Sequence, residues 1–371
     1  MSEGSGGGAP KPSRSVSQGA KSIMKRQLTL AAAALAAVVL SSCATKEEPV
    51  AANTLVASKV AAAPKLADLA ADPVWAKARP ISVDLSGGAN FGGKGSTTAT
   101  IKAVYSGDRI YMLVQYADPT DSVRRGPFQK QANGSWVALK SADNKGGDEN
   151  TYYEDKWAFI WPMNNSIKGF DQQGCMVACH LGEGKPYGNK YTAAAGEIGD
   201  MWHMKGSRSA RVGKVDDQYL NHIQYEGGKN PNAGRQSDPG VTGGDYAGIK
   251  LVNGKPEFMN KDGKAGNAGG AFYIVNGNQV PFDDSKFKAG DEVASYIVNQ
   301  LVGDRGDIDV VTQWKNGVLT SVLSRKLVTG SPYDVQFSKL DAAYPFGFAA
   351  FDNAQVRHAV HFGALYLKFE Q

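Results

Sequence analysis

The sequence predicts an all-β protein, a β-sandwich with long loop-rich insertions. Three observations predict this fold. Several segments alternate apolar and polar residues with a period of two, tight turn signals join some of them, and no amphipathic helical pattern runs longer than about three turns. The chain has 371 residues and only three cysteines, and a chain of this length can build a core without disulfide bonds.

The N-terminal part is predicted to lie outside the folded domain. Residues 1–23 are rich in Gly and Ser and cannot bury a core, so we expect them to be disordered or to precede the true start at Met24. Residues 24–42 combine a short basic start, an apolar run and small residues, which is the pattern of a secretory signal peptide. The apolar run is too short to span a bilayer, which takes about 20 residues.

A lipid anchor is predicted at the end of this signal. The ending "LSSC" resembles a bacterial lipobox, in which the cysteine becomes the lipidated first residue, so Cys43 is the predicted attachment site. The alternative is a stray cysteine near an ordinary cleavage site. The Ala-rich residues 43–73 are predicted to be a flexible tether, with a short helix near Leu66–Leu69. We therefore expect an exported lipoprotein on the periplasmic side of a bacterial membrane, inner or outer.

The basic character of the chain lies mostly in this leader. The full chain has a formal net charge of +5, from 41 basic and 36 acidic residues. Residues 1–42 hold five of the basic residues and one of the acidic ones, so the mature chain keeps 36 and 35 and a net charge of +1. A nearly neutral domain offers no electrostatic reason to expect nucleic-acid binding.

The predicted sandwich domain covers residues 74–371. Its strands are expected where apolar and polar residues alternate, at residues 81–85, 98–106, 109–118, 156–161, 307–314, 317–327, 333–338, 346–352 and 358–369. Residues 165–300 are dominated by Gly, Asn, Asp and Lys and are predicted to be long loops with a few short elements. Loops this long in a compact domain are usually functional or organised by something bound.

The loop-rich middle contains "GCMVACH", residues 174–180, in which two cysteines precede a histidine. The usual c-type haem attachment motif has two residues between its cysteines, whereas three stand here. In such a site each cysteine bonds a porphyrin vinyl group and the histidine binds the iron. The motif therefore predicts one covalently attached haem c, held by Cys175 and Cys179, with His180 as an axial ligand.

Other chemistries at this motif stay open. A Cys175–Cys179 disulfide is possible in an oxidising compartment, although so small a loop contributes little stability. A zinc site would be one ligand short, because His180 and two thiolates supply only three of the four that zinc needs. A Cys–His nucleophile pair would leave the second cysteine unexplained.

A second axial ligand must come from elsewhere in the chain. The candidates are His203, Met204, His222, His358 and His361, with Met201 and Lys205 less favoured. Beside His203, Trp202 could wall a flat apolar pocket, and Lys205 and Arg208 could bind haem propionates. His358 and His361 stand three apart on a predicted strand, so they should face opposite sides of the sheet.

Five blocks occur in an order that resembles a known family. They are "YEDKWAFIW", "GCMVACH", "GDMWHMKGSR", "RKLVTGSPYDVQF" and "YPFGFAAFDNAQVRHAV". Over roughly residues 75–371 the chain resembles the ethylbenzene-dehydrogenase-related haem-binding domain. That family includes the γ subunits of periplasmic molybdenum oxidoreductases and a branch of exported c-type cytochromes. The resemblance implies a β-sandwich with haem at its edge, and His180 and His358 as the axial pair, with His203 as the runner-up.

Together these inferences predict an exported, lipid-anchored monohaem c-type cytochrome that passes single electrons between redox partners. The expected partners are a molybdenum oxidoreductase or other cytochromes. Two axial histidines would leave no open iron position, so we expect a carrier and not an enzyme. Two alternatives remain. One is a non-catalytic module of the same fold that binds a ligand, such as a sugar or b-type haem, with Cys175 and Cys179 oxidised. The other is a haem enzyme with an open iron site and peroxidase-like activity.

Overall fold

The computed structural model describes residues 51–142, 144, 147–180, 188–240 and 244–371. The predicted disordered start, the signal peptide and the lipidation site at Cys43 lie outside the described residues. Within the described ranges, no helix has both the length and the apolar character needed to cross a membrane.

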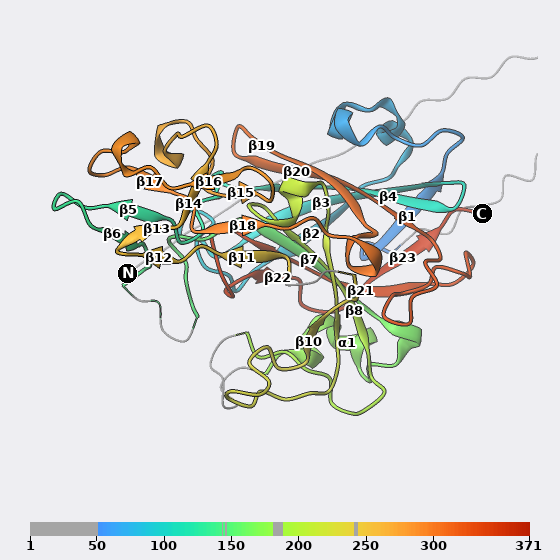
Figure 1. Cartoon of the computed structure of the whole chain (residues 1–371). Coiled ribbons are helices and arrows are strands. Elements are labelled where there is room, and N and C mark those ends of the chain that lie inside the picture. The colour runs from blue at the N-terminus through green and yellow to red at the C-terminus, as the bar shows by residue number, and fades with distance from the viewer. Residues whose placement is uncertain (1–50, 143, 145–146, 181–187, 241–243) are drawn as a thin grey trace, which may run out of the picture. The chain divides into compact units, whose positions relative to one another are not determined.

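Thirteen strands form one continuous sheet, in the order β10-β9-β8-β7-β21-β23-β1-β3-β4-β20-β19, with β2 paired to β3 and β22 to β21. Their bounds are β1 (Thr54–Lys59), β2 (Ile81–Leu85), β3 (Thr97–Ser106), β4 (Arg109–Ala117), β7 (Lys156–Pro162), β8 (Gly199–Lys205), β9 (Asp216–Leu220), β10 (Arg235–Ser237), β19 (Asp309–Lys315), β20 (Val318–Lys326), β21 (Tyr344–Phe351), β22 (Ala359–Val360) and β23 (Leu365–Phe369). Figure 1 shows these strands at the centre of the molecule.

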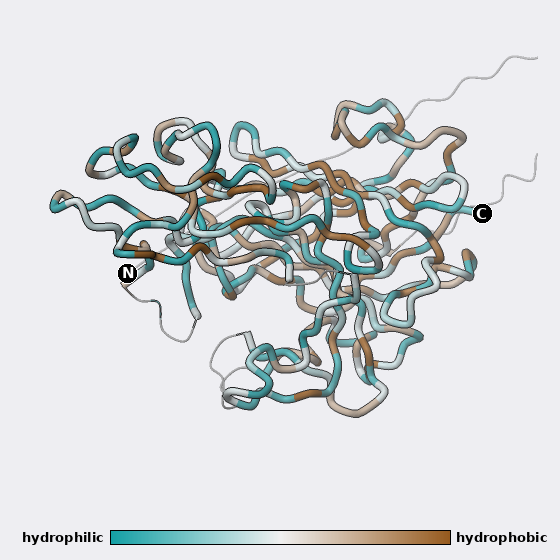
Figure 2. The backbone as a smooth tube through the Cα atoms, viewed as in Figure 1, coloured by the Kyte–Doolittle hydropathy of each residue, from teal (hydrophilic) through white to brown (hydrophobic). Residues whose placement is uncertain are grey.

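The two halves of this sheet enclose one aromatic core, which makes the fold a β-sandwich. Trp157 and Phe159 from β7 and Trp202 from β8 are fully buried, and they pack in the same cluster as Ile101 of β3 and Met112 of β4. In Figure 2 the apolar residues follow the strands, whereas the connecting loops are mainly hydrophilic. Burial of large apolar side chains from both halves is the main driving force for closing the sandwich. The predicted all-β sandwich is confirmed.

The predicted tether contains a central strand. β1 pairs in parallel with β23 on one side and β3 on the other, and its Leu55 and Ala57 are fully buried in the core. The 3₁₀ helices η1 (Leu66–Ala71) and η2 (Pro73–Lys77) then cover the outer side of β3 and β4. The prediction of a flexible tether is therefore wrong for residues 54–59, whereas the short helix predicted near Leu66–Leu69 is present as η1. A strand paired on both sides inside the sheet can be this short, which makes it hard to recognise in an Ala-rich segment.

The remaining strand predictions differ in outcome. Seven predicted strands are present with bounds shifted by at most two residues, but residues 333–338 form no strand, and a turn divides residues 358–369 into β22 and β23. The prediction of loops is wrong for β8 and β9, which are strands of the main sheet. Both carry buried polar side chains, such as Asp200 and Asp217, and these hide the alternation that sequence patterns depend on.

Short strands outside the main sheet surround a separate apolar cluster that includes Trp136, Ile274 and Phe287. It lies to the left in Figure 1. These strands are β5 (Phe128–Lys130), β6 (Trp136–Ala138), β11 (Tyr246–Gly248), β12 (Leu251–Val252), β13 (Lys255–Pro256), β14 (Phe258–Asn260), β15 (Ile274–Val275), β16 (Gln279–Pro281), β17 (Glu292–Val293) and β18 (Tyr296–Val298). The helical turns are η3 (Met163–Asn165), α1 (Phe170–Gln173), η4 (Gly174–Ala178), η5 (Ser209–Val212), η6 (Gly266–Ala268), η7 (Asp284–Lys286) and η8 (Gly303–Gly306).

Candidate functional site

The cysteine motif lies on the face of the sheet opposite the aromatic core. Cys175, in η4, is 3% exposed and packs against β21. The approach is so close that a Cβ added to Gly347 would lie 2.9 Å from the Cβ of Cys175, which explains a glycine in this strand. The other side chains of this apolar cluster come from β7, β8, β21, β22 and the turns beside them, and include Ala158, Ile160, Phe170, Met201, Ala349, Phe351 and Val360.

The two cysteines are free thiols with different acidities. A hydrogen bond from Cys175 lowers the pKa of Cys179 well below its ordinary value, and the charge of Lys190 adds to this effect against the opposing effect of burial. The Nζ of Lys190 lies 3.4 Å from the Sγ of Cys179. The same hydrogen bond, together with burial, raises the pKa of Cys175. Cys179 is therefore the more acidic thiol of the pair and Cys175 the less acidic one.

His180 directly follows Cys179 in the chain, but its Nε2 faces the protein and not open space. Its ring stacks on Tyr191, with centroids 3.6 Å apart and planes at 8°. Its Nε2 lies 3.1 Å from the Tyr191 carbonyl oxygen, and its backbone N–H donates to Asn189. Ligation of iron through Nε2 would require this ring to turn. Residues 181–187, which follow the motif, lie outside the described residues.

Two other predicted histidines lie on the same face, on either side of Phe351. The ring of His358 is 4.7 Å from that of Phe351, and the ring of His203 is 5.8 Å from it. The Nδ1 of His358 is 2.8 Å from the carbonyl oxygen of Val356, and the Nδ1 of His203 is 3.2 Å from Oε1 of Gln218. Because both oxygens accept, each Nδ1 carries the proton and each Nε2 keeps its lone pair.

Both imidazoles are neutral, which is the state that binds a metal. Burial, with a contribution from Lys190, lowers the pKa of His358 to about 3. Burial and the charge of Lys205 also lower the pKa of His203 well below its usual range. The Nε2 of His203 is buried and has no hydrogen-bond partner. An unsatisfied buried acceptor is rare in a folded protein and calls for an explanation.

The remaining predicted ligands lie elsewhere. Met204 is in the aromatic core, on the wrong face of β8. The Nδ1 of His361 lies 3.2 Å from the carbonyl oxygen of Asp84, at an exposed position. His358 and His361 lie on opposite ends of the two-residue strand β22 and not on one continuous strand. Met201 does share the face of Cys175. His222 lies outside the regular elements, between β9 and β10.

The predicted contacts around His203 need correction. Trp202 points into the core, fully buried, with its Nε1 donating to Asp200, so it cannot wall a pocket with the cysteine motif. Neighbouring residues of a strand face opposite sides of the sheet, and His203 and Trp202 obey this rule.

Lys205 and Arg208 are also engaged elsewhere. Lys205 forms ion pairs with Asp216 and Asp245, and Arg208 forms ion pairs with Glu154 and Asp245. Burial raises the pKa of Glu154, but Arg208 and Arg125 outweigh that effect and lower it to about 2. These buried cations are therefore neutralised, and the prediction that they bind propionates is wrong for this arrangement.

A different lysine, Lys156, lies on this face without a carboxylate partner among the described residues. The Nζ of Lys156 lies 4.0 Å from the centroid of the Phe351 ring and donates to the carbonyl oxygen of Gln355 at 2.8 Å. It makes no ion pair with any described residue, and burial lowers its pKa well below the ordinary value. Sequence analysis missed Lys156. The sequence feature that could have pointed to Lys156 is a lysine at the start of an apolar strand, "KWAFIWP", whose residues are all buried.

The residues present fit a haem in part. His203 and His358 offer neutral imidazoles, Lys156 and Lys190 offer positive charge for carboxylates, and the strands between them carry small side chains, with Ala158 paired to Ala349. The orientation of His180 and the burial of Cys175 do not yet suit covalent attachment. The face is thus suited to an apolar ligand that has metal-binding and anionic groups.

Comparisons with known proteins place the chain in a family. No curated protein sequence matches it. Solved structures with detectable likeness include a family 9 carbohydrate-binding module from Caldicellulosiruptor kristjanssonii in complex with glucose, at 9% identity and a TM-score of 0.31, covering 86% of this chain and 97% of that one. A putative carbohydrate-binding protein from Bacteroides uniformis gives 11% identity and a TM-score of 0.34, covering 85% and 99%.

Likenesses with TM-scores this low transfer no ligand to the present chain. The sequence comparison is more decisive, because the family model described as "Ethylbenzene dehydrogenase" matches residues 72–362, which is more than half of the chain. That range includes the cysteine motif, His203 and His358, and every strand of the main sheet except β1 and β23. The chain belongs to the ethylbenzene dehydrogenase family.

Proposed function

We propose that this chain is a non-catalytic haem-binding module, and that the haem lies on the face of β7, β8 and β21 opposite the aromatic core. One observation carries the proposal. His203 and His358 are neutral and keep the Nε2 lone pair, and the Nε2 of His203 is buried without a partner. A haem supplies an iron that gains or loses one electron.

Each residue of this face has a defined task in the proposal. Val356 orients His358 through the Nδ1 hydrogen bond, and Gln218 does the same for His203. Such contacts fix the tautomer and make the free nitrogen a better ligand. Lys156 and Lys190 offset carboxylate charge, and apolar neighbours such as Phe351 exclude water.

The experiment is spectroscopy of the exported full chain, produced in a host that makes haem. We expect close to one haem per chain and a low-spin spectrum. His358→Ala should lose the low-spin spectrum, and so should His203→Ala if His203 is the second ligand. His361→Ala is the matched control, because His361 lies three residues from His358 at an exposed position. A wild-type protein that holds no haem would overturn the proposal.

A sharper form of this function is a monohaem c-type cytochrome that carries electrons. The motif order and the lowered pKa of Cys179 support it. A cysteine thiol adds across a vinyl C=C bond, so that an S–C bond forms and the proton goes to the other vinyl carbon, with no oxidant or reductant. Haem that stays on the chain in a denaturing gel, and leaves it in Cys175→Ser and Cys179→Ser, is the expected result. Haem that is released by denaturation would show a non-covalent site and would leave the module proposal standing.

Export and anchoring belong to the same proposal. We expect Cys43 to carry lipid on the periplasmic side of the membrane, so that the haem can exchange electrons with a molybdenum oxidoreductase or another cytochrome. The mass of the mature chain should begin at Cys43 and include the lipid, and Cys43→Ser should release the protein from the membrane fraction. An enzyme with an open iron site would instead show a high-spin spectrum that changes when carbon monoxide or cyanide is added.

A further inference from the structure

The core side of β8 and β9 carries a second site with different chemistry, the aspartate cluster. Asp200 is in β8 and Asp217 in β9, and carboxylate oxygens of these two and of Asp334 lie within 4.8 Å of one another. Asp238 follows β10 and Asp307 follows η8, and the charges of both act on this group. Five separate segments of the chain therefore bring their carboxylates to one place.

The cluster contains carboxylate oxygens that nothing satisfies. Asp238 is 3% exposed, and no described N–H or hydroxyl group donates to its carboxylate oxygens, although its carboxyl can share a proton with that of Asp334. In Asp200, Oδ2 accepts from Trp202 Nε1 at 3.0 Å and from the Val335 N–H at 2.9 Å, while Oδ1 is buried without a partner. One oxygen each of Asp217, Asp307 and Asp334 is orphaned in the same way. Buried oxygens that accept no hydrogen bond are costly, and they cluster here.

The charge of the cluster is also uncompensated. Arg325 is fully buried and lies 3.0 Å from Asp334 and 3.5 Å from Asp200. In the part of the chain that the structure describes, it is the one cation that forms an ion pair with any of the five aspartates. Five ionised carboxylates against one guanidinium would leave four negative formal charges in a buried place. Burial accordingly raises the pKa of Asp238 to about 9 and that of Asp200 to about 7, so bound protons balance part of this charge when no cation is present.

We propose that the aspartate cluster binds a hard divalent cation of the calcium type. Calcium takes six to eight oxygen ligands at about 2.3–2.6 Å, so two oxygens on one ion lie up to about 5 Å apart, and oxygens of Asp200, Asp217 and Asp334 lie within 4.8 Å of one another. The ligand set contains only oxygen, and this excludes the softer sites that select zinc or copper. Several carboxylates in a narrow space favour calcium over magnesium, which keeps its waters and rigid octahedral geometry.

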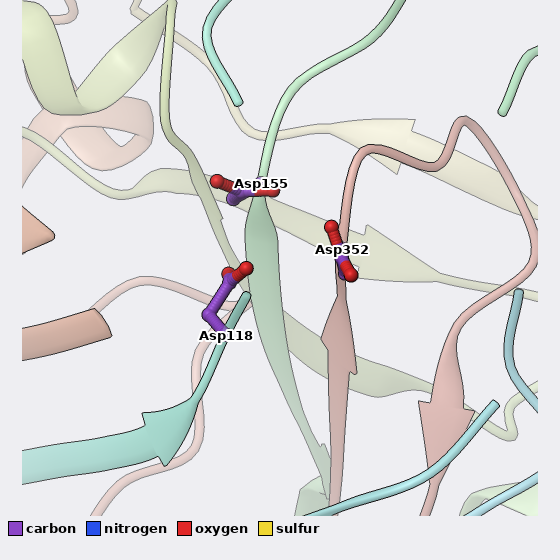
Figure 3. Close-up of side chains that lie close together, drawn as sticks. All are labelled: Asp118, Asp155 and Asp352. Carbon is purple, nitrogen blue, oxygen red and sulfur yellow. The ribbon is translucent and has the colours of Figure 1, made fainter. Parts of the chain in front are cut away.

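A second group of buried aspartates shows why burial alone does not carry this proposal. Asp118, Asp155 and Asp352 lie close together at the ends of three strands (Figure 3). Backbone N–H groups of Ser122 and Asn353 donate to both oxygens of Asp155. Asp352 accepts from Phe91 and Thr120, and one oxygen of Asp118 accepts from Thr120. Only one of the six carboxylate oxygens in this group has no hydrogen-bond donor, so the group serves as an internal control.

The cation would stabilise the position of β8, the strand that carries His203. It would link β8 and β9 to the segments that follow β10, η8 and β20. The proposal does not depend on the proposed haem, because the two sites lie on opposite faces of β8.

The test is calcium binding by the full chain after treatment with EDTA and dialysis. Calorimetric titration should give one site per chain, and calcium at about 100 times its Kd should raise Tm by about 5 °C. Asp217→Asn and Asp238→Asn should each weaken calcium binding at least tenfold. Asp118→Asn is the matched control, since it neutralises a buried aspartate of the other group, and it should leave the calcium affinity unchanged.

Two results would overturn the proposal. One is a wild-type protein whose Tm and calorimetric trace are the same with calcium and with EDTA. The other is a loss of calcium binding in Asp118→Asn but not in Asp238→Asn. If Asp217→Asn does not fold, Asp307→Asn gives the same readout, because Asp307 is only half-buried and its replacement disturbs the core less. An Asp307→Asn variant with wild-type affinity would remove Asp307 from the ligand set and, together with an unchanged Asp238→Asn, would reject the site.

Discussion

Two groups of buried aspartates occur in the same sandwich, and they differ in what their carboxylates bond to. In the group of Asp118, Asp155 and Asp352, five of the six oxygens accept a hydrogen bond from the protein. In the aspartate cluster around Asp200, both oxygens of Asp238 and one oxygen of each other member have no donor. Hydrogen-bond donors, and not the number of carboxylates, therefore separate the first group from the proposed cation site.

The first group needs only a proton. Burial and the charge of Asp352 raise the pKa of Asp118 to about 8, so its carboxyl is protonated at neutral pH and can donate to a neighbouring carboxylate. In the aspartate cluster burial likewise raises the pKa of Asp238 to about 9 and that of Asp200 to about 7, but six orphaned oxygens are spread over five aspartates there, against one in the first group. Variants that remove one charge from each group therefore test whether the two groups differ in this way.

The largest effect is expected for Arg325→Met. This change leaves five carboxylates with no internal cation, and removing one partner of a buried ion pair costs about 3–5 kcal/mol. In EDTA we expect a loss of that size in the free energy of unfolding, measured by urea denaturation. Calcium should recover much of it, because the bound cation takes over the charge balance that Arg325 supplied.

The control for this variant is Arg109→Met. Arg109 pairs with Asp309 at 3.3 Å, but the Asp309 side chain is 46% exposed, so the expected loss is at most about 1 kcal/mol and should not respond to calcium. If calcium leaves the gap between wild type and Arg325→Met unchanged, the cation does not bind among these aspartates.

A smaller effect, with a pH dependence, is expected for Asp118→Asn. The folded pKa of about 8 lies above the unfolded value of about 3.9. Between these values the folded state binds more protons than the unfolded state, so the contribution of Asp118 to stability falls as pH rises. Asparagine imitates the protonated acid. Near pH 5 the unfolded carboxyl is already ionised, so the variant should be somewhat more stable than wild type there, and its advantage should grow by roughly 3 kcal/mol by pH 8.5.

Urea denaturation at the two pH values measures this effect. The charged and titratable groups that face Asp118 are Asp352, Asp155, Asp121 and Tyr116, and none of them is changed in the variant. A stability difference that is equal at both pH values would mean that Asp118 is not protonated in the folded state at neutral pH, and the two groups would then be alike.

The sequence predicts the sandwich well but loses the strands that carry polar side chains inward. The segments 98–106 and 109–118 alternate clearly and are strands. β8 and β9 are missed because buried residues such as Asp200, Asp216 and Gln218 give them the composition of loops. β1 is missed because it is a short apolar run inside an Ala-rich segment. Buried polar groups and short inner strands depend on tertiary partners that a local pattern does not contain.

The candidate sites show the same limit. Motif spacing brings Cys175, Cys179 and His180 together, and family resemblance adds His358, which the structure places on the same face. Trp202 was expected beside the haem, yet strand alternation already separates it from His203. The aspartate cluster had no sequence signal at all, because its consecutive members stand between 17 and 69 residues apart along the chain and meet only through the topology of the sheet.

The smallest expected effect is a change in terbium emission, which tests where the cation binds. Trp202 Nε1 lies 3.0 Å from Asp200, so an ion in the aspartate cluster would lie close to this indole. Terbium binds oxygen sites of the calcium type and emits when a nearby tryptophan is excited. We expect wild-type protein to sensitise terbium emission and Trp202→Phe to lose most of it, with the calcium-induced rise in Tm kept. Trp157→Phe, on the neighbouring strand in the same core, is the control and should keep the emission. Equal emission from the two variants would place the ion elsewhere, even if calcium still stabilised the protein.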